Sequence, residues 1–109
     1  MAIDEGLAER VRDLTADRPG MSERKMFGGL CFMQNGNMCC GIVGSELMVR
    51  VGVEAYEQAL AFPAAREMNF TGRSMRGMVY VGEAGLSEDE DLSAWLERGL
   101  EYAGSLPPK

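Results

Sequence analysis

The stretch Lys25–Val51, KMFGGLCFMQNGNMCCGIVGSELMVRV, decides the fold of this chain. Short apolar runs alternate in it with glycine and asparagine, a pattern typical of short β-strands joined by tight turns. Asn35-Gly36 has apolar residues on both sides, which is a strong signal for a two-residue hairpin loop. The stretch therefore predicts three or four antiparallel strands in succession.

The Asn35-Gly36 turn also predicts a register for the two strands that it joins. With these residues at the tip, Met33 is expected to face Met38, and Cys31 to face Cys40. Side chains alternate between the two faces of a strand. One face is then expected to hold Cys31, Met33, Met38, Cys40 and Ile42, and the other Leu30, Phe32 and Cys39.

The predicted pairing makes the first of these faces rich in sulfur. Cys31 and Cys40 are expected to lie with their Cα atoms about 4.5 Å apart, within reach of a disulfide. Together with Met33 and Met38 they also form a soft set of ligands that suits Cu(I). Packing in a core or an interface is the ordinary role of such residues and is our leading interpretation, with a thiol switch and a copper site as alternatives.

Residues 24–34 are expected to form one strand that Gly28-Gly29 interrupts. Paired glycines inside a strand indicate a bulge, a bend, or the close approach of another backbone or a ligand. A phosphate cradle is the sharper alternative, although the pair lacks the longer spacing of a phosphate-binding glycine loop. After the hairpin, Leu47–Val51 is a further strand, with Met48 and Arg50 on the second face of the sheet.

Amphipathic helices are predicted on both sides of this region. Residues 3–17 carry one helical stripe with Asp4 as the N-cap, and a short helix that begins after Gly52 ends before Pro63. A capping box at Ser87–Glu90 is expected to open the last helix. The apolar positions predicted for these helices are Ile3, Leu7, Val11 and Leu14, then Val53, Tyr56, Ala59 and Leu60, then Leu92, Trp95, Leu96, Gly99, Leu100 and Ala103.

The segment Arg66–Val81 is expected to be extended around a turn at Thr71–Ser74, with Val79 and Val81 facing one way and Met78 and Tyr80 the other. The pattern as a whole predicts the α+β class. We expect two layers, with an antiparallel sheet of about five strands covered by N-terminal, middle and C-terminal helices. Residues 1–109 are expected to form a single domain.

Composition excludes several classes of function. The chain has no histidine, which excludes Ser-His-Asp and Cys-His sites as well as His-ligated zinc sites. Three cysteines without a CxxC spacing are expected to stay reduced. No run reaches the ~18 apolar residues of a membrane span, and the acidic first residues do not form a signal peptide. We therefore expect a cytoplasmic protein that is not an enzyme and carries no metal or cofactor.

The net charge of −6 is unevenly distributed, and the middle of the chain keeps a basic character. Arginine side chains bind phosphate and carboxylate groups, and glycines allow backbone N–H groups to approach a ligand. The acidic pI makes direct DNA binding by this domain alone unexpected. The candidate binding residues for an anion are Lys25, Phe27, Gly28, Gly29, Arg50, Gly72, Arg73 and Arg76.

Several short motifs follow one another in a specific order: Lys25-Met26-Phe27-Gly28-Gly29-Leu30, Asn35-Gly36, Leu47-Met48-Val49-Arg50-Val51-Gly52, Phe70-Thr71-Gly72-Arg73, Leu92-x-x-Trp95 and Leu106-Pro107-Pro108-Lys109. In this order and spacing the chain resembles the TfoX N-terminal domain family, named after the TfoX/Sxy regulators of competence for DNA transformation. The resemblance implies an α+β domain with an antiparallel sheet and a link to transcription regulation. The named regulators carry a C-terminal domain as well, and we expect this chain to be a stand-alone N-terminal-like domain.

Three functions follow from these observations. The leading hypothesis is a non-enzymatic regulatory module that binds a protein partner or forms a homodimer, because methionine-rich surfaces adapt to varied partners. The second is binding of a small anionic ligand or a nucleic-acid phosphate through Lys25, Arg50, Arg73 and Arg76. The third is an enzyme that uses a cysteine thiolate beside Lys or Arg.

Overall fold

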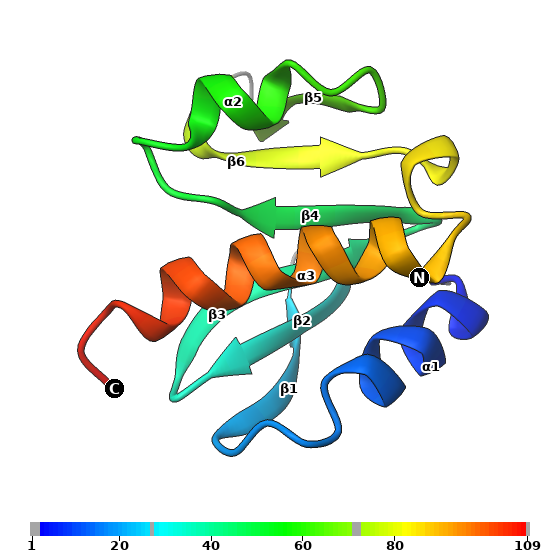
Figure 1. Cartoon of the computed structure of the whole chain (residues 1–109), viewed down its shortest axis with the longest axis vertical. Coiled ribbons are helices and arrows are strands. Elements are labelled where there is room, and N and C mark those ends of the chain that lie inside the picture. The colour runs from blue at the N-terminus through cyan, green and yellow to red at the C-terminus, as the bar shows by residue number, and fades with distance from the viewer. Residues whose placement is uncertain (1–2, 27, 71–72, 109) are drawn as a thin grey trace.

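The computed structural model describes residues 3–26, 28–70 and 73–108, which form one antiparallel sheet and three α-helices (Figure 1). The strand order is β1-β2-β3-β4-β6-β5. The strands are β1 (Met21–Met26), β2 (Gly29–Gln34), β3 (Asn37–Val43), β4 (Glu46–Arg50), β5 (Ala65–Phe70) and β6 (Arg73–Val81). The helices are α1 (Glu5–Leu14), α2 (Tyr56–Leu60) and α3 (Asp89–Gly104), with a 3₁₀ turn η1 (Glu83–Gly85). The predicted α+β class is confirmed.

The sheet has six strands where we expected about five, because the region predicted as one strand contains a hairpin. β1 ends at Met26, β2 begins at Gly29, and these two residues pair with each other. Gly28, in the connection, has a φ of 73°, which glycine adopts without strain. The predicted close approach is found at Gly29, where an added Cβ would lie 2.1 Å from the carbonyl oxygen of Ile42. The single strand over residues 24–34 was therefore a wrong prediction.

The predicted hairpin at Asn35-Gly36 is confirmed. Asn35 and Gly36 have φ values of 52° and 84°, as a two-residue loop with both central residues left-handed requires. Next to the loop, Met33 pairs with Met38, as predicted.

Beyond that pair, the register of β2 and β3 shifts by one residue. Phe32 pairs with Cys40 and Cys31 pairs with Gly41, so Cys39 is the extra residue of a β-bulge. The predicted pairing of Cys31 with Cys40 is wrong. The bulge places Cys40 in the same core as Phe32, whereas Cys31 belongs to a separate cluster on the other face.

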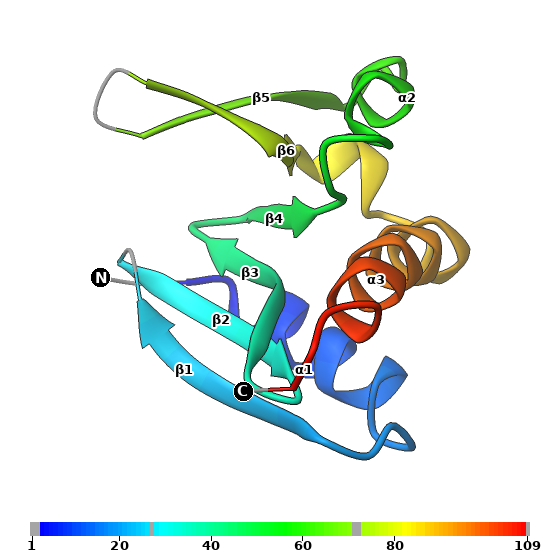
Figure 2. The ribbon, with the colours of Figure 1, turned by 90° about the vertical axis from the view of Figure 1, so that its left-hand side faces the viewer.

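The three helices lie on one face of the sheet, as Figures 1 and 2 show. α3 crosses β3 and β4, α1 lies beside α3, and α2 packs against β5 and β6. The buried residues of α3 are the six that the sequence predicted, and Leu47, Val49, Val79 and Val81 of the sheet also belong to this core. None of the described helices is long and apolar enough to span a membrane.

α3 approaches the sheet closely at the bulge. A Cβ added to Gly99 would lie 2.3 Å from the carbonyl oxygen of Cys39, a distance that only a shift of the backbone relieves. Gly99 therefore sets how near the helix comes to β3.

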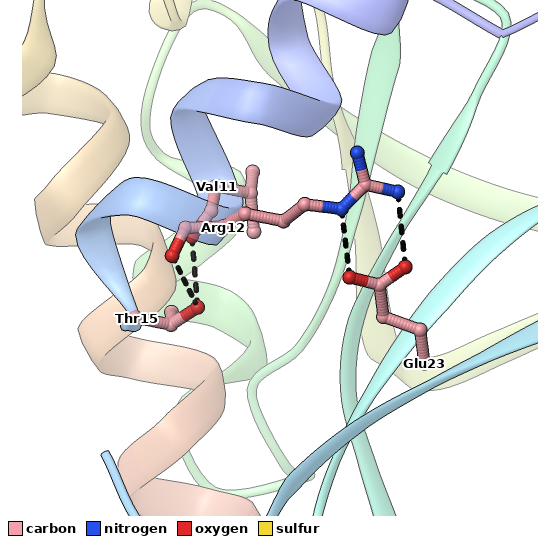
Figure 3. Close-up of polar contacts among 4 residues, drawn as sticks. All are labelled: Val11, Arg12, Thr15 and Glu23. Carbon is pink, nitrogen blue, oxygen red and sulfur yellow. Dashed lines mark hydrogen bonds and ion pairs between the residues drawn. The ribbon is translucent and has the colours of Figure 1, made fainter. Parts of the chain in front are cut away.

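α1 is fixed at both ends by polar contacts. The Asp4 carboxylate accepts a hydrogen bond from the Leu7 N–H at 3.1 Å, which confirms the predicted N-cap. Near the other end, the Arg12 guanidinium donates to both carboxylate oxygens of Glu23 on β1, at 2.7 and 3.0 Å (Figure 3). The Thr15 hydroxyl donates to the Val11 carbonyl at 2.8 Å. The Arg12–Glu23 pair joins the helix to β1, the edge strand of the sheet, and the other two bonds cap the ends of the helix.

Two local predictions for the helices were wrong. α3 begins at Asp89 after an N-cap at Glu88 that makes no side-chain capping bond, so the capping box at Ser87–Glu90 does not form. Val53, predicted on the apolar side of the middle helix, precedes α2 and is 62 % exposed.

Candidate functional site

The structure does not bring Lys25 and Arg50 together. Lys25 on β1 pairs with Leu30, which belongs to the core under the helices, and Arg50 on β4 pairs with Met78, which belongs to the opposite face. Paired residues share a face, so the two side chains leave the sheet on opposite faces, although the Arg50 guanidinium reaches Tyr102 of α3 on the helix side. β2 and β3 separate their strands, a distance of about 14 Å at the usual spacing between strands.

Arg50 makes contacts within the domain. Its guanidinium lies over the ring of Tyr102 on α3, 5.2 Å from the ring centroid, and Nη1 donates to the Met38 carbonyl at 3.5 Å. A cation over an aromatic face stabilises the fold without a ligand.

The other candidate anion-binding residues are only partly described. Gly28 and Gly29 belong to the β1–β2 hairpin, as described above. Phe27 and Gly72 lie outside the described residues, and the structure describes only the backbone of Arg73 and Arg76 on β6. The anion site therefore stays a prediction.

A cluster of sulfur-containing side chains lies on the face of the sheet away from the helices, which curves as Figure 2 shows. Cys31 of β2 pairs with Gly41 of β3, and Gly41 pairs in turn with Met48 of β4. A Cβ at Gly41 would lie 2.7 Å from Cε of Met48 and 3.2 Å from Sγ of Cys31, so both side chains pack over this glycine. The buried members of the cluster are Cys31, Met33, Met48 and Met78, with Met38, Val43 and Tyr80 partly buried against them.

The cysteines are buried and form no disulfide. Burial raises the pKa of the Cys31 thiol. The Cys39 thiol donates to the Phe32 carbonyl at 3.3 Å and lies 3.9 Å from the sulfur of Cys40. That contact and burial both raise the pKa of Cys40. The raised pKa values keep the Cys31 and Cys40 thiols protonated at neutral pH, whereas the contact with Cys40 lowers the pKa of Cys39.

Two adjoining surface hollows lie along α3, on the side that faces α2. One has a volume of about 800 Å³ and the adjoining one about 380 Å³, and they share Ala94 and Arg98. We name them together the α2–α3 groove. Its lining residues are Val51, Gly52, Val53, Glu54, Ala55, Gln58, Phe62, Pro63, Ala64, Ala84, Gly85, Asp91, Ala94, Trp95, Glu97, Arg98, Glu101, Tyr102 and Ser105.

Exposed apolar side chains lie at the two ends of this groove. At one end Phe62, which is 44 % exposed, packs edge-on against Trp95 with the ring centroids 5.2 Å apart. The Arg98 guanidinium lies 4.9 and 5.3 Å from these two centroids. At the other end Val53 is exposed next to Tyr102, whose ring lies against Gly52. The groove thus has an apolar pocket at each end, and the Arg98 cation covers the rings of one of them.

The walls of the groove are acidic. Glu97 forms an ion pair with Arg18, whereas Glu54, Asp91 and Glu101 form none with any residue of the described ranges. The other ion pairs that the structure describes neutralise arginines elsewhere, between Arg10 and Asp89, Arg12 and Glu23, and Arg66 and Glu46. The groove therefore presents apolar surface bordered by unneutralised carboxylates.

Sequence reasoning missed this groove. Val53 was expected to be buried, and Phe62 was not singled out. The available signal was the position of Phe62 directly before Pro63, at the end of the short helix, where a large apolar side chain has little of its own helix to cover it.

We compared the chain with known proteins. No curated protein and no solved structure matches it. The family model of the TfoX N-terminal domain matches residues 13–103, from the last two residues of α1 nearly to the end of α3. This match covers most of the chain and all six strands, and it confirms the resemblance found in the motifs. The chain therefore belongs to the TfoX N-terminal domain family.

Proposed function

We propose that this protein is a non-enzymatic regulatory module that acts by binding another protein, related to the TfoX/Sxy regulators of competence. The observation that carries the proposal is the α2–α3 groove, in which Val53 and Phe62 expose apolar surface beside acidic residues. Apolar surface with a polar border is typical of protein interaction sites. Membership of the TfoX N-terminal domain family supports the regulatory role.

The chemistry of the side chains supports a binding function over catalysis. The chain has no histidine, and the raised pKa values of Cys31 and Cys40 disfavour the thiolate that a cysteine enzyme requires. The pKa of Cys39 is lowered, but this side chain is fully buried. The three unbridged thiols are suited to a reducing compartment, so we propose a cytoplasmic location.

The partner in this proposal is a different protein or a second copy of the chain. The surface contributed by Val53 and Phe62 lies outside the core and is accessible to either. Anion binding is less well supported, because β2 and β3 separate the strands of Lys25 and Arg50 by about 14 Å.

Two measurements test the proposal. One is sedimentation velocity over a wide range of protein concentration, and the other is quantitative affinity capture from cells that express the protein. The wild type is expected to self-associate or to retain one partner in stoichiometric amount. Val53→Asp is expected to abolish that association without affecting the fold, since this side chain is exposed.

Leu14→Asp is the matched control, because Leu14 is 39 % exposed and lies on α1, outside the groove. This variant is expected to associate like the wild type. A wild type that stays monomeric at high concentration and retains nothing beyond an unrelated bait would contradict the proposal.

A further inference from the structure

The two apolar pockets of the α2–α3 groove lie two helical turns apart. Phe62 and Trp95 form one pocket, and Val53 and Tyr102 form the other. Trp95 and Tyr102 are both on α3, separated by seven positions, which corresponds to about 10.5 Å along the helix axis. A helix bound alongside α3 presents side chains i and i+7 at the same separation.

The wall that α3 contributes has the spacing of a helix-packing surface. Five of its groove-lining residues recur at alternating intervals of three and four positions, the spacing at which residues share one face of a helix. Trp95, Glu97 and Tyr102 line the groove beside them. Ala94, which lines both hollows, has a small side chain that lets a second helix come close. The five regularly spaced residues are Asp91, Ala94, Arg98, Glu101 and Ser105.

The backbone at the base of the groove is already hydrogen-bonded. The N–H groups of Val51 and Gly52 both donate to the Gly77 carbonyl, at 2.8 and 3.0 Å. An extended segment gains affinity from main-chain bonds to a free strand edge, which these groups do not offer. A helix satisfies its own backbone and needs only side-chain contacts.

The charge of the groove selects a cationic occupant. The carboxylates of Glu54, Asp91 and Glu101 have no ion-pair partner among the described residues, and the one arginine in the lining, Arg98, lies over the rings of Phe62 and Trp95. Complementary charge around apolar anchors speeds association and excludes other partners.

We infer that the α2–α3 groove binds a basic amphipathic helix of a partner protein, with two apolar anchors at positions i and i+7 and Lys or Arg residues flanking them. This inference rests on the proposed interaction function and names the chemistry of its partner. One anchor enters the Phe62–Trp95 pocket and the other the Val53–Tyr102 pocket, while the flanking cations face the carboxylates.

Fluorescence anisotropy with a labelled synthetic peptide of about 18 residues tests the inference, since shorter helices are marginal in water. The peptide carries leucines at i and i+7, alanines between them on the same face, and lysines elsewhere. It is expected to bind the full chain saturably. A peptide of the same composition with the leucines five positions apart, and one with glutamates in place of the lysines, are expected to bind about tenfold more weakly or not at all.

Two protein variants with the same change in charge locate the site. Glu54→Lys with Glu101→Lys is expected to weaken binding at least about tenfold. Asp13→Lys with Asp17→Lys changes exposed residues outside the groove and is expected to leave affinity within about twofold of the wild type. Thermal melts confirm that each variant is folded. If the variant with Glu54→Lys and Glu101→Lys does not fold, Val53→Asp is used in its place.

If the two double-lysine variants bind the peptide equally weakly, the inference is overturned, because binding then follows net charge alone. Equal affinity for the two leucine spacings would overturn it as well. If the basic peptide does not bind while Val53 is still required for capture of a partner, the helix inference fails and the interaction function stands. If capture also fails, both proposals fall.

Discussion

Gly99 of α3 lies directly against the backbone carbonyl of Cys39, the extra residue of the bulge in β3. The helix that covers the core therefore rests on the one point at which the β2–β3 register shifts. This contact depends both on the absence of a side chain at Gly99 and on the extra residue, Cys39, in β3.

Gly99→Ala is expected to destabilise the protein by about 1–3 kcal/mol, because the new methyl group overlaps the Cys39 carbonyl. The loss outweighs the gain of up to about 1 kcal/mol in helix propensity. Urea unfolding measures the change in the free energy of unfolding. Gly104→Ala, at the end of the same helix with nothing within 4 Å of the new Cβ, is expected to be neutral or slightly stabilising. Equal stability of the two variants would contradict the contact.

Arg50→Ala is expected to lower the free energy of unfolding by about 0.5–1 kcal/mol, through loss of the cation–π contact with Tyr102. Lys25→Ala, at an exposed position, is expected to change it by less than about 0.5 kcal/mol. A double-mutant cycle with Arg50→Ala and Tyr102→Ala isolates the pair. A coupling energy of zero would show that the stacking contributes nothing.

Stability is expected to fall in acid partly through Glu23 and Glu46. A hydrogen bond and attraction from Arg12 lower the pKa of Glu23, and Arg66 does the same for Glu46. A carboxyl group whose folded pKa is depressed stabilises the fold above its unfolded pKa of about 4.3, and this contribution is lost as the pH falls through the folded pKa. Each pair is partly exposed, so its contribution is at most about 1 kcal/mol.

The double variant Glu23→Gln with Glu46→Gln is expected to flatten the loss of unfolding free energy between about pH 6 and pH 3, measured by urea titrations at each pH. Asp17→Asn, an exposed change with no ion pair among the described residues, serves as the control. If the unfolding free energy falls as steeply in acid in the double variant as in the wild type, the two ion pairs do not explain the loss of stability.

Cys31, Cys39 and Cys40 are expected to resist iodoacetamide in the folded protein at neutral pH and to react fully in urea, because all three are buried. Mild oxidation is expected to produce no disulfide between Cys31 and Cys40, since the two lie on opposite faces of the sheet. Peptide mapping by mass spectrometry checks both outcomes. Labelling faster than that of a free cysteine would revive the hypothesis of a thiolate enzyme.

The parts of the fold that the sequence predicts well depend on local signals. Asn35-Gly36 has the residues that its turn requires, and the apolar stripe of α3 has the helical period, so both were predicted correctly. The bulge at Cys39 has no local signal, since it depends on how α3 contacts β3. The missed hairpin at β1–β2 follows from reading Gly28-Gly29 as an interruption of one strand instead of its end.

The candidate site was less predictable than the fold. The α2–α3 groove combines Val53 and Phe62 with residues of α3 some thirty to fifty positions later, and only the tertiary structure brings them together. An apolar residue in a helical pattern is normally assigned to the core, which is why the exposure of Val53 was not foreseen.

Among the described strands, only the pairing of β4 with β6 joins strands that are not consecutive in the chain, with Leu47 opposite Val81. Strands that are distant along the chain close a long loop, which slows folding. α3, which covers β3 and β4, comes later still. During synthesis on the ribosome, the first four strands therefore emerge well before the segments that shield their apolar side, and we expect a nascent chain at that stage to be prone to aggregation.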